Sequence, residues 1–110
     1  MPLVKIHVED AVWRASRTEL VAALKPIRSM LCAAFNVDIA AAQLAIIPVF
    51  GVEDQAPVAA EVRILPKPER TPDLIRGACE RLRAMLEDAT GQRAVIRCMQ
   101  VDPSVYLTLK

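Results

Sequence analysis

The feature that most constrains the fold is a strand, helix and strand pattern that occurs twice along the 110 residues. Apolar and polar residues alternate over residues 4–9, the period-two pattern of a strand with one buried face. The alternation returns at residues 58–65, after a turn-like connection at residues 51–57. Apolar runs at residues 43–50 and 94–101 predict one further strand after each helix. The chain is therefore expected to fold as two βαβ units in tandem.

The first helix is expected at about residues 17–35. Residues 16–19 read Ser-Arg-Thr-Glu, the form of a capping box in which the serine and glutamate side chains each bond the other's backbone N–H. Pro26 should bend the helix, because its ring removes one hydrogen-bond donor and crowds the preceding turn. Asn36 is a suitable left-handed stop.

The second helix repeats the start and the end of the first. Thr71 is expected as the N-cap with Pro72 at the first helical position, and Gly91 as the stop. Thr71 follows Ser16 by 55 residues, and Gly91 follows Asn36 by the same 55. Matched caps and stops at one spacing indicate a duplicated unit.

Pro2 has no counterpart in the second unit. The strands align at a shift of 56, which places Val4 over Ala60 and leaves Val58 in the position of Pro2. If an aminopeptidase removes Met1, Pro2 carries a free secondary amine at the start of a strand. A tethered amine can lose solvation and have its pKa lowered into the range of a general base. Taken alone, Met-Pro is also an ordinary way for a chain to begin.

Two tandem βαβ units predict an α/β (α+β) architecture, a four-stranded mixed sheet with two helices on one face. We expect a single domain over residues 1–110, with units at about 1–51 and 57–104 and a short C-terminal tail strand near 105–109. Two arrangements fit this order of elements. In the first, each unit keeps its two strands adjacent and parallel. In the second, the strands of the two units interleave as in the ferredoxin-like fold.

The other face of the sheet is expected to be a mixed surface. Lys5, His7, Glu61 and Arg63 point there beside Leu3 and Ala59, which is too polar for a core and suits an oligomer interior or water. The net charge of +1 predicts no strongly basic surface for nucleic acid or an acidic membrane, and the four aromatic residues are too few to stack on bases.

Three cysteines without a Cys-x-x-Cys pair, and no signal peptide or long apolar run, predict a cytoplasmic protein with cysteines that fill the core. One histidine and scattered carboxylates predict no metal site.

The first strand resembles the opening of 4-oxalocrotonate tautomerase, in the residues Pro2-Leu3-Val4-Lys5-Ile6-His7-Val8. The paired Ile46-Ile47 in the second strand extends the likeness. With two units, the chain is similar to longer members of the tautomerase superfamily, such as 5-carboxymethyl-2-hydroxymuconate isomerase-like proteins. The resemblance implies a tautomerase (MIF-like) fold, a homotrimer, a small-molecule carboxylate substrate, and neither metal nor cofactor.

The resemblance also implies site residues. The catalytic base would be Pro2. The loop after the first strand would supply Arg14, with Arg17 as a near alternative, and an apolar wall residue would be Phe50. The second unit would supply Arg70 from its loop and Arg97 from its last strand. Taken singly, each arginine is more often a solvated surface charge.

The function expected from these residues is a 1,3-keto-enol tautomerase or isomerase acting on a small 2-oxo or unsaturated carboxylate. Pro2 would take a proton from the carbon beside a carbonyl, and the arginines would hold the carboxylate and stabilise the enolate. Hydration, dehalogenation or decarboxylation at the same amine are variants. The alternative is a non-catalytic ferredoxin-like small-molecule-binding or oligomeric structural module.

Overall fold

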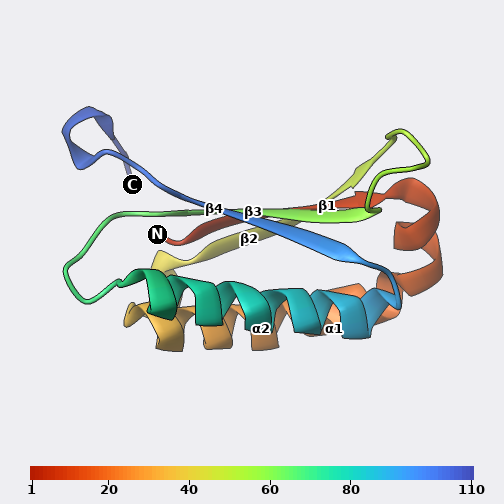
Figure 1. Cartoon of the computed structure of the whole chain (residues 1–110), viewed down its shortest axis with the longest axis horizontal. Helices are drawn as coiled ribbons and strands as arrows, with labels where there is room; N and C mark the ends of the chain where they lie inside the picture. Colours follow the sequence, from red (N-terminus) through yellow and green to blue (C-terminus); the bar gives the residue numbers. More distant parts are fainter.

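The computed structural model describes residues 1–110 and shows two helices packed side by side against one face of a four-stranded sheet (Figure 1). The strands are β1 (Leu3–Glu9), β2 (Gln43–Val49), β3 (Val58–Ile64) and β4 (Ala94–Gln100). The helices are α1 (Asp10–Phe35) and α2 (Pro72–Thr90), with short 3-10 turns at Ile39–Ala41 and Pro103–Val105. Neither helix is both long and apolar enough to cross a membrane.

The strand order is β2-β1-β3-β4. Strands β1 and β2 are parallel neighbours, as are β3 and β4, and β1 pairs antiparallel with β3 to join the two halves. Each βαβ segment therefore keeps its own two strands adjacent. The interleaved ferredoxin-like arrangement is wrong for this chain.

The core lies between the sheet and the helices. The predicted alternation is confirmed, because Val4, Ile6 and Val8 are fully buried while Lys5 between them is exposed. The helices contribute a stripe of buried side chains to the same cluster: Leu20, Ile27, Leu31 and Phe35 from α1, and Ala78, Leu82 and Leu86 from α2. Burial of one such aliphatic or aromatic side chain contributes about 1.5–3 kcal/mol, so this cluster is the main source of stability.

The predicted start of the first helix is only partly right: the backbone breaks at Ser16 and a helical segment follows it as expected, but a further helical segment from Asp10 precedes it. Helix α1 begins at Asp10, directly after β1, and Ser16 is a kink inside it with φ −119° and ψ 19°. Ser16 makes no capping hydrogen bond. The early turn is favoured by an ion pair of 3.1 Å between Arg14 and Asp10, whose negative charge also suits a helix N-terminus. At Pro26 the backbone stays helical, so the interruption lies at Ser16.

The other predicted helix ends are confirmed. Asn36 and Gly91 both adopt left-handed conformations, with φ of 53° and 65°, and terminate α1 and α2. The Thr71 hydroxyl accepts a hydrogen bond of 3.2 Å from the backbone N–H of Leu74, and Pro72 stands at the first helical position. The duplicated helix signals therefore correspond to duplicated backbone geometry at the C-terminal ends of the two helices, and not at their N-terminal ends.

The predicted C-terminal tail strand is wrong. After β4, the backbone N–H of Val101 still donates to the carbonyl of Ile64, and the chain then turns at Pro103–Val105. The Asp102 carboxylate stabilises this turn by accepting from the backbone N–H and hydroxyl of Ser104. After this turn, residues 106–110 pair with neither of the free edge strands, β2 and β4, within the single chain.

The sheet face opposite the helices is open and mixed in polarity, as predicted. Along one row of this face, Lys5 lies opposite Glu61, and Glu61 lies opposite Arg97. The edge position expected from Pro48 is confirmed, because β2 is an outer strand. Both the open face and the two edge strands, β2 and β4, remain without a partner in the single chain.

Candidate active site at the start of β1

Pro2 lies at a fixed position at the beginning of the central strand β1. The residue is buried, and its carbonyl accepts a hydrogen bond of 3.0 Å from the backbone N–H of Gln43 at the start of β2. The chain terminus is therefore held against the sheet. With Met1 in place the Pro2 nitrogen is an amide, and removal of Met1 would place a secondary amine at this anchored position.

Positive groups gather around the chain start. The pKa of the Met1 amine is lowered from its ordinary value chiefly by burial, and then by the nearby charges of Lys110, Arg70 and Lys67, while Cys32 acts in the opposite direction. Figure 1 shows the two termini at the same end of the sheet, beside the loop that precedes α2. An amine held here gives up its proton more readily than one in water.

Arg70 is the one predicted arginine that the structure places near Pro2. Its side chain is 5% exposed, and its two terminal nitrogens donate to the carbonyls of Leu65 and Phe35, the latter at 3.2 Å. The guanidinium also lies 5.5 Å from the centre of the Phe35 ring, and its Nε has no partner. Arg70 thus ties the end of α1 to the loop before α2 and supplies a fixed positive charge.

Arg14 and Arg17 lie at the opposite end of β1. Arg14 was expected on a loop, but it lies on the first segment of α1, where it pairs with Asp10. Arg17 packs over Trp13 at 6.0 Å from the ring centre. Since β1 has seven residues at about 3.3 Å each, these arginines are separated from Pro2 by about 20 Å along the strand. One chain does not bring them together with Pro2.

Phe50 and Arg97 are also away from the chain start. Phe50 follows β2, which runs parallel to β1, so it lies at the far end of the sheet, and it is 88% exposed. Arg97 lies on the open face two strands from β1, in the row of Lys5, at about 14 Å from the Pro2 backbone by strand spacing. Only a second chain would place Phe50 against Pro2.

Sequence reasoning missed Lys67 and Lys110. Lys67 stands between two prolines in the loop before α2, and Lys110 is the last residue, so neither belongs to a motif. They reach the chain start because the loop and the tail fold back to the same end of the sheet. No group of three or more His, Cys, Asp or Glu side chains is placed to hold a metal ion.

A scan of protein-family models finds no match, and neither does a search of curated proteins. Solved structures do match, over nearly the whole chain. A fused 4-OT wild-type asymmetric trimer, F6, superposes with a TM-score of 0.75 at 7% identity, covering 97% of this chain and 92% of the other. The duplicated βαβ protein described here therefore shares its architecture with fused 4-OT proteins.

Two further structures extend this likeness. Pt0534 inactivated by 2-oxo-3-pentynoate superposes with a TM-score of 0.75 at 13% identity, covering 94% of this chain and 89% of the other. The macrophage migration inhibitory factor-like protein of Entamoeba histolytica superposes with a TM-score of 0.71 at 10% identity, covering 97% and 94%. The chain has the tautomerase fold, and the predicted resemblance is confirmed at the level of the fold.

Proposed function

We propose that this protein is a 1,3-keto-enol tautomerase or isomerase acting on a small 2-oxo or unsaturated carboxylate. The observation that carries the proposal is the anchored, partly buried chain start, where burial and nearby cations lower the pKa of an amine. After removal of Met1, Pro2 would supply this amine. The fold supports the proposal without demonstrating the activity, since one fold hosts many functions.

In the proposed reaction the neutral Pro2 amine takes a proton from the carbon beside the substrate carbonyl. The electrons of that C–H bond form the enolate. The protonated amine then returns the proton to the enolate oxygen in a tautomerisation, or to a different carbon of an unsaturated substrate in an isomerisation, and ketonisation is the reverse of the first path. Lys67 and Lys110 would attract the substrate carboxylate, and Arg70 would stabilise the developing negative charge as a fixed cation. The reaction needs neither a metal nor an organic cofactor.

We also propose a homotrimer in which one copy completes the site of another. Arg14, Arg17 and Phe50 lie at the end of the sheet opposite Pro2, so they can act on it only from a neighbouring copy. The open face and the unpartnered edge strands would be covered in such an assembly. The proposal keeps residues 1–110 as one domain with units at about 1–51 and 57–104, in the cytoplasm, where its three free cysteines stay reduced.

The role of Pro2 is tested by mass and by rate. Intact mass of protein from the native cell should show that Met1 is absent, and a mass that includes Met1 contradicts the mechanism. Ketonisation of the enol of phenylpyruvate, or of 2-hydroxymuconate, should fall about a hundredfold in Pro2→Ala, the range for loss of a positioned general base. Arg76→Ala, which changes an exposed arginine of α2 that the mechanism does not use, is the control. Equal rates in the wild type and Pro2→Ala would remove Pro2 from the mechanism.

The shared site is tested by mixing two variants. Pro2→Ala and Arg14→Ala homomers, each expected to be nearly inactive, are unfolded and refolded together in equal amounts. If Pro2 and Arg14 of one site come from different copies, about a quarter of the sites regain both residues. No recovery after confirmed co-assembly would show that Arg14 does not complete the site. Arg17→Ala is tested in the same way.

A non-catalytic binding module is the second candidate function. The observation that favours it is that the predicted substrate cations Arg14 and Arg70 already have protein partners, an aspartate and two backbone carbonyls. Such a module would bind small carboxylates at the chain start without turnover. Calorimetric binding of phenylpyruvate with no ketonisation above background, in protein lacking Met1, would select this function over the enzyme.

A further inference from the structure

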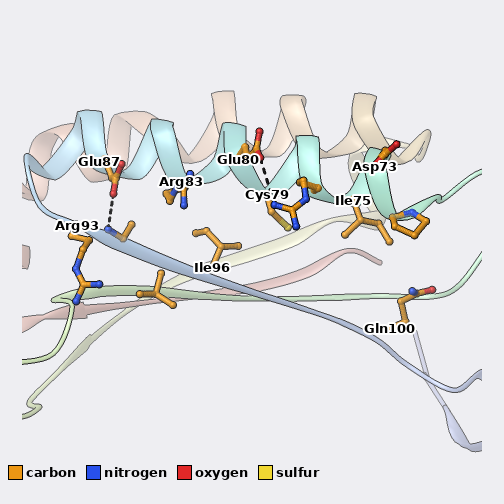
Figure 2. A pocket seen from close by; sticks show the side chains of 13 residues that line it. Asp73, Ile75, Cys79, Glu80, Arg83, Glu87, Arg93, Ile96 and Gln100 are labelled. Carbon is orange, nitrogen blue, oxygen red and sulfur yellow. Dashed lines mark hydrogen bonds and ion pairs between the residues drawn. The ribbon is translucent and has the colours of Figure 1, made fainter.

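A groove lies between α2 and the edge strand β4. It has a volume of about 1000 Å³ and is open to solvent (Figure 2). Cys79 lies on the side of α2 that faces this groove, near an ion pair of 3.9 Å between Arg76 and Glu80. The proposed tautomerase site does not use this groove, so the role of its thiol needs a separate explanation.

The packing of α2 on β4 places Cys79 beside Cys98. At one end of the contact between α2 and β4, the carboxylate of Glu87 accepts a hydrogen bond of 3.0 Å from the backbone N–H of Ala94. Cys79 precedes Glu87 by eight residues, about 12 Å along a helix, and Cys98 follows Ala94 by four residues, about 13 Å along a strand. Because the strand runs back beneath the helix, both distances lead in the same direction (Figure 1). The two cysteines therefore lie at the same level.

The side chains also point toward each other. Cys98 shares the helix-facing side of β4 with Ala94 and Ile96, and it packs against the core. Cys79 lines the groove together with Ile96 and Gln100, the residues two before and two after Cys98 on that same side. The two thiols are also close enough to change each other's pKa. Two thiols that face each other across this contact between helix and strand can form a disulfide after side-chain rotation.

The interaction between the two thiols gives them different reactivities. Cys98 lowers the pKa of Cys79 to about 7, against the opposing effect of burial, and Cys79 raises the pKa of Cys98 well above its ordinary value. Since the thiolate is the nucleophile, Cys79 is the reactive member and Cys98 remains a protonated partner. Cys32 is 4% exposed on α1, where its thiol donates to the carbonyl of Asp38.

We propose that Cys79 and Cys98 are a redox pair that a peroxide converts into a reversible disulfide between α2 and β4. The Cys79 thiolate attacks one oxygen of the peroxide, the O–O bond breaks, and hydroxide or alkoxide leaves, so that Cys79 becomes a sulfenic acid. The Cys98 sulfur then attacks the Cys79 sulfur, and the Cys98 proton leaves with the hydroxyl group as water. The two thiols lose two electrons together, and the peroxide gains them.

The pair is tested on the full chain with hydrogen peroxide. Increasing equivalents of peroxide are added, free thiols are blocked with N-ethylmaleimide, and peptides are analysed by mass spectrometry without reduction. The expected product is one cross-linked peptide pair joining Cys79 to Cys98, lighter by two hydrogen atoms, with Cys32 blocked by maleimide. Dithiothreitol should reverse it. Oxidation of Cys32 before the pair, or cross-links between copies in place of this bond, would overturn the proposal.

Single substitutions separate the two roles. Cys98→Ser should stop at a Cys79 sulfenic acid that dimedone traps, and Cys79→Ser should leave Cys98 in its thiol form at the same peroxide dose. Cys32→Ser is the matched control and should still form the bond. Where a variant does not fold, competitive alkylation of the wild type decides, because Cys79 should react at least tenfold faster than Cys98. Equal alkylation rates would contradict the assigned roles.

Discussion

Replacement of Arg70 by methionine should destabilise the protein strongly. The substitution keeps much of the side-chain volume but removes the donors to the carbonyls of Phe35 and Leu65. A hydrogen bond from a charged group contributes about 1.5–3 kcal/mol, so two of them amount to about 3–6 kcal/mol. The substitution also removes a buried charge and the Nε, which has no hydrogen-bond partner, and both changes stabilise the folded protein and offset part of this loss. We expect a net loss of about 3 kcal/mol in the free energy of unfolding.

Urea unfolding at 25 °C, followed by circular dichroism, measures this loss. Domains of this size have a total stability of about 5–15 kcal/mol, so the variant should remain folded in the absence of urea. Arg70→Lys is the matched control for charge, because lysine keeps a cation but cannot donate to both carbonyls in a planar fork. Both variants should therefore be destabilised.

The same pair of variants separates the electrostatic role of Arg70 from its structural role. Arg70 lowers the pKa of the Met1 amine by its charge, so this pKa should rise in Arg70→Met and stay low in Arg70→Lys. Burial remains the larger cause, and the rise should be partial. A methionine variant within 0.5 kcal/mol of the wild type, or an unchanged amine pKa in both variants, would refute the reasoning.

Three further predictions concern other parts of the fold. Thr71→Ala removes the N-cap of α2 and should cost about 1 kcal/mol in urea unfolding, whereas Thr71→Ser should be nearly neutral. Glu61→Lys would place three cations side by side on the open face, so it should dissociate the proposed oligomer in sedimentation velocity runs at low salt, and Glu61→Gln should not. Iodoacetamide alkylation of Cys79 should increase as the pH rises through about 7 and level off above it, because the thiolate fraction grows with pH, and a single rise near pH 9 would contradict the thiol pair.

Oxidation of the thiol pair should also change stability. A disulfide between Cys79 and Cys98 closes a loop of about 20 residues, which the chain-entropy model converts to about 3 kcal/mol. The oxidised protein should therefore unfold at a higher urea concentration than the reduced protein. Equal midpoints would indicate that the bond strains the contact between α2 and β4.

The sequence predicted the strands and most helix ends because these depend on local rules. Alternation of apolar residues determines which face of a strand is buried, and Asn36, Thr71 and Gly91 carry the backbone preferences that helix ends require. The start of α1 was missed because a capping-box pattern at Ser16 suggested a helix start, whereas the chain was already helical from Asp10. The local preference of Ser16 appears as a kink.

The tail and the site depend on long-range structure. Alternating apolar residues near the C-terminus resemble a strand, but the turn at Pro103–Val105 redirects the chain and residues 105–109 pair with neither edge strand of the single chain. Arg70 was identified as a site residue, yet sequence gave no sign that its donors are used by two carbonyls. Lys67 and Lys110 were missed because only the folded chain brings them to Pro2.

The most direct test of the proposed mechanism is the pKa of the Pro2 amine itself. Protein labelled with ¹⁵N-proline and lacking Met1 is titrated by NMR, once folded and once unfolded in urea. We predict a single terminal amine whose pKa in the folded protein lies below its pKa in the unfolded chain, since burial and the surrounding cations disfavour its charged form. Equal pKa values in the two states would contradict the account of Pro2 as a general base.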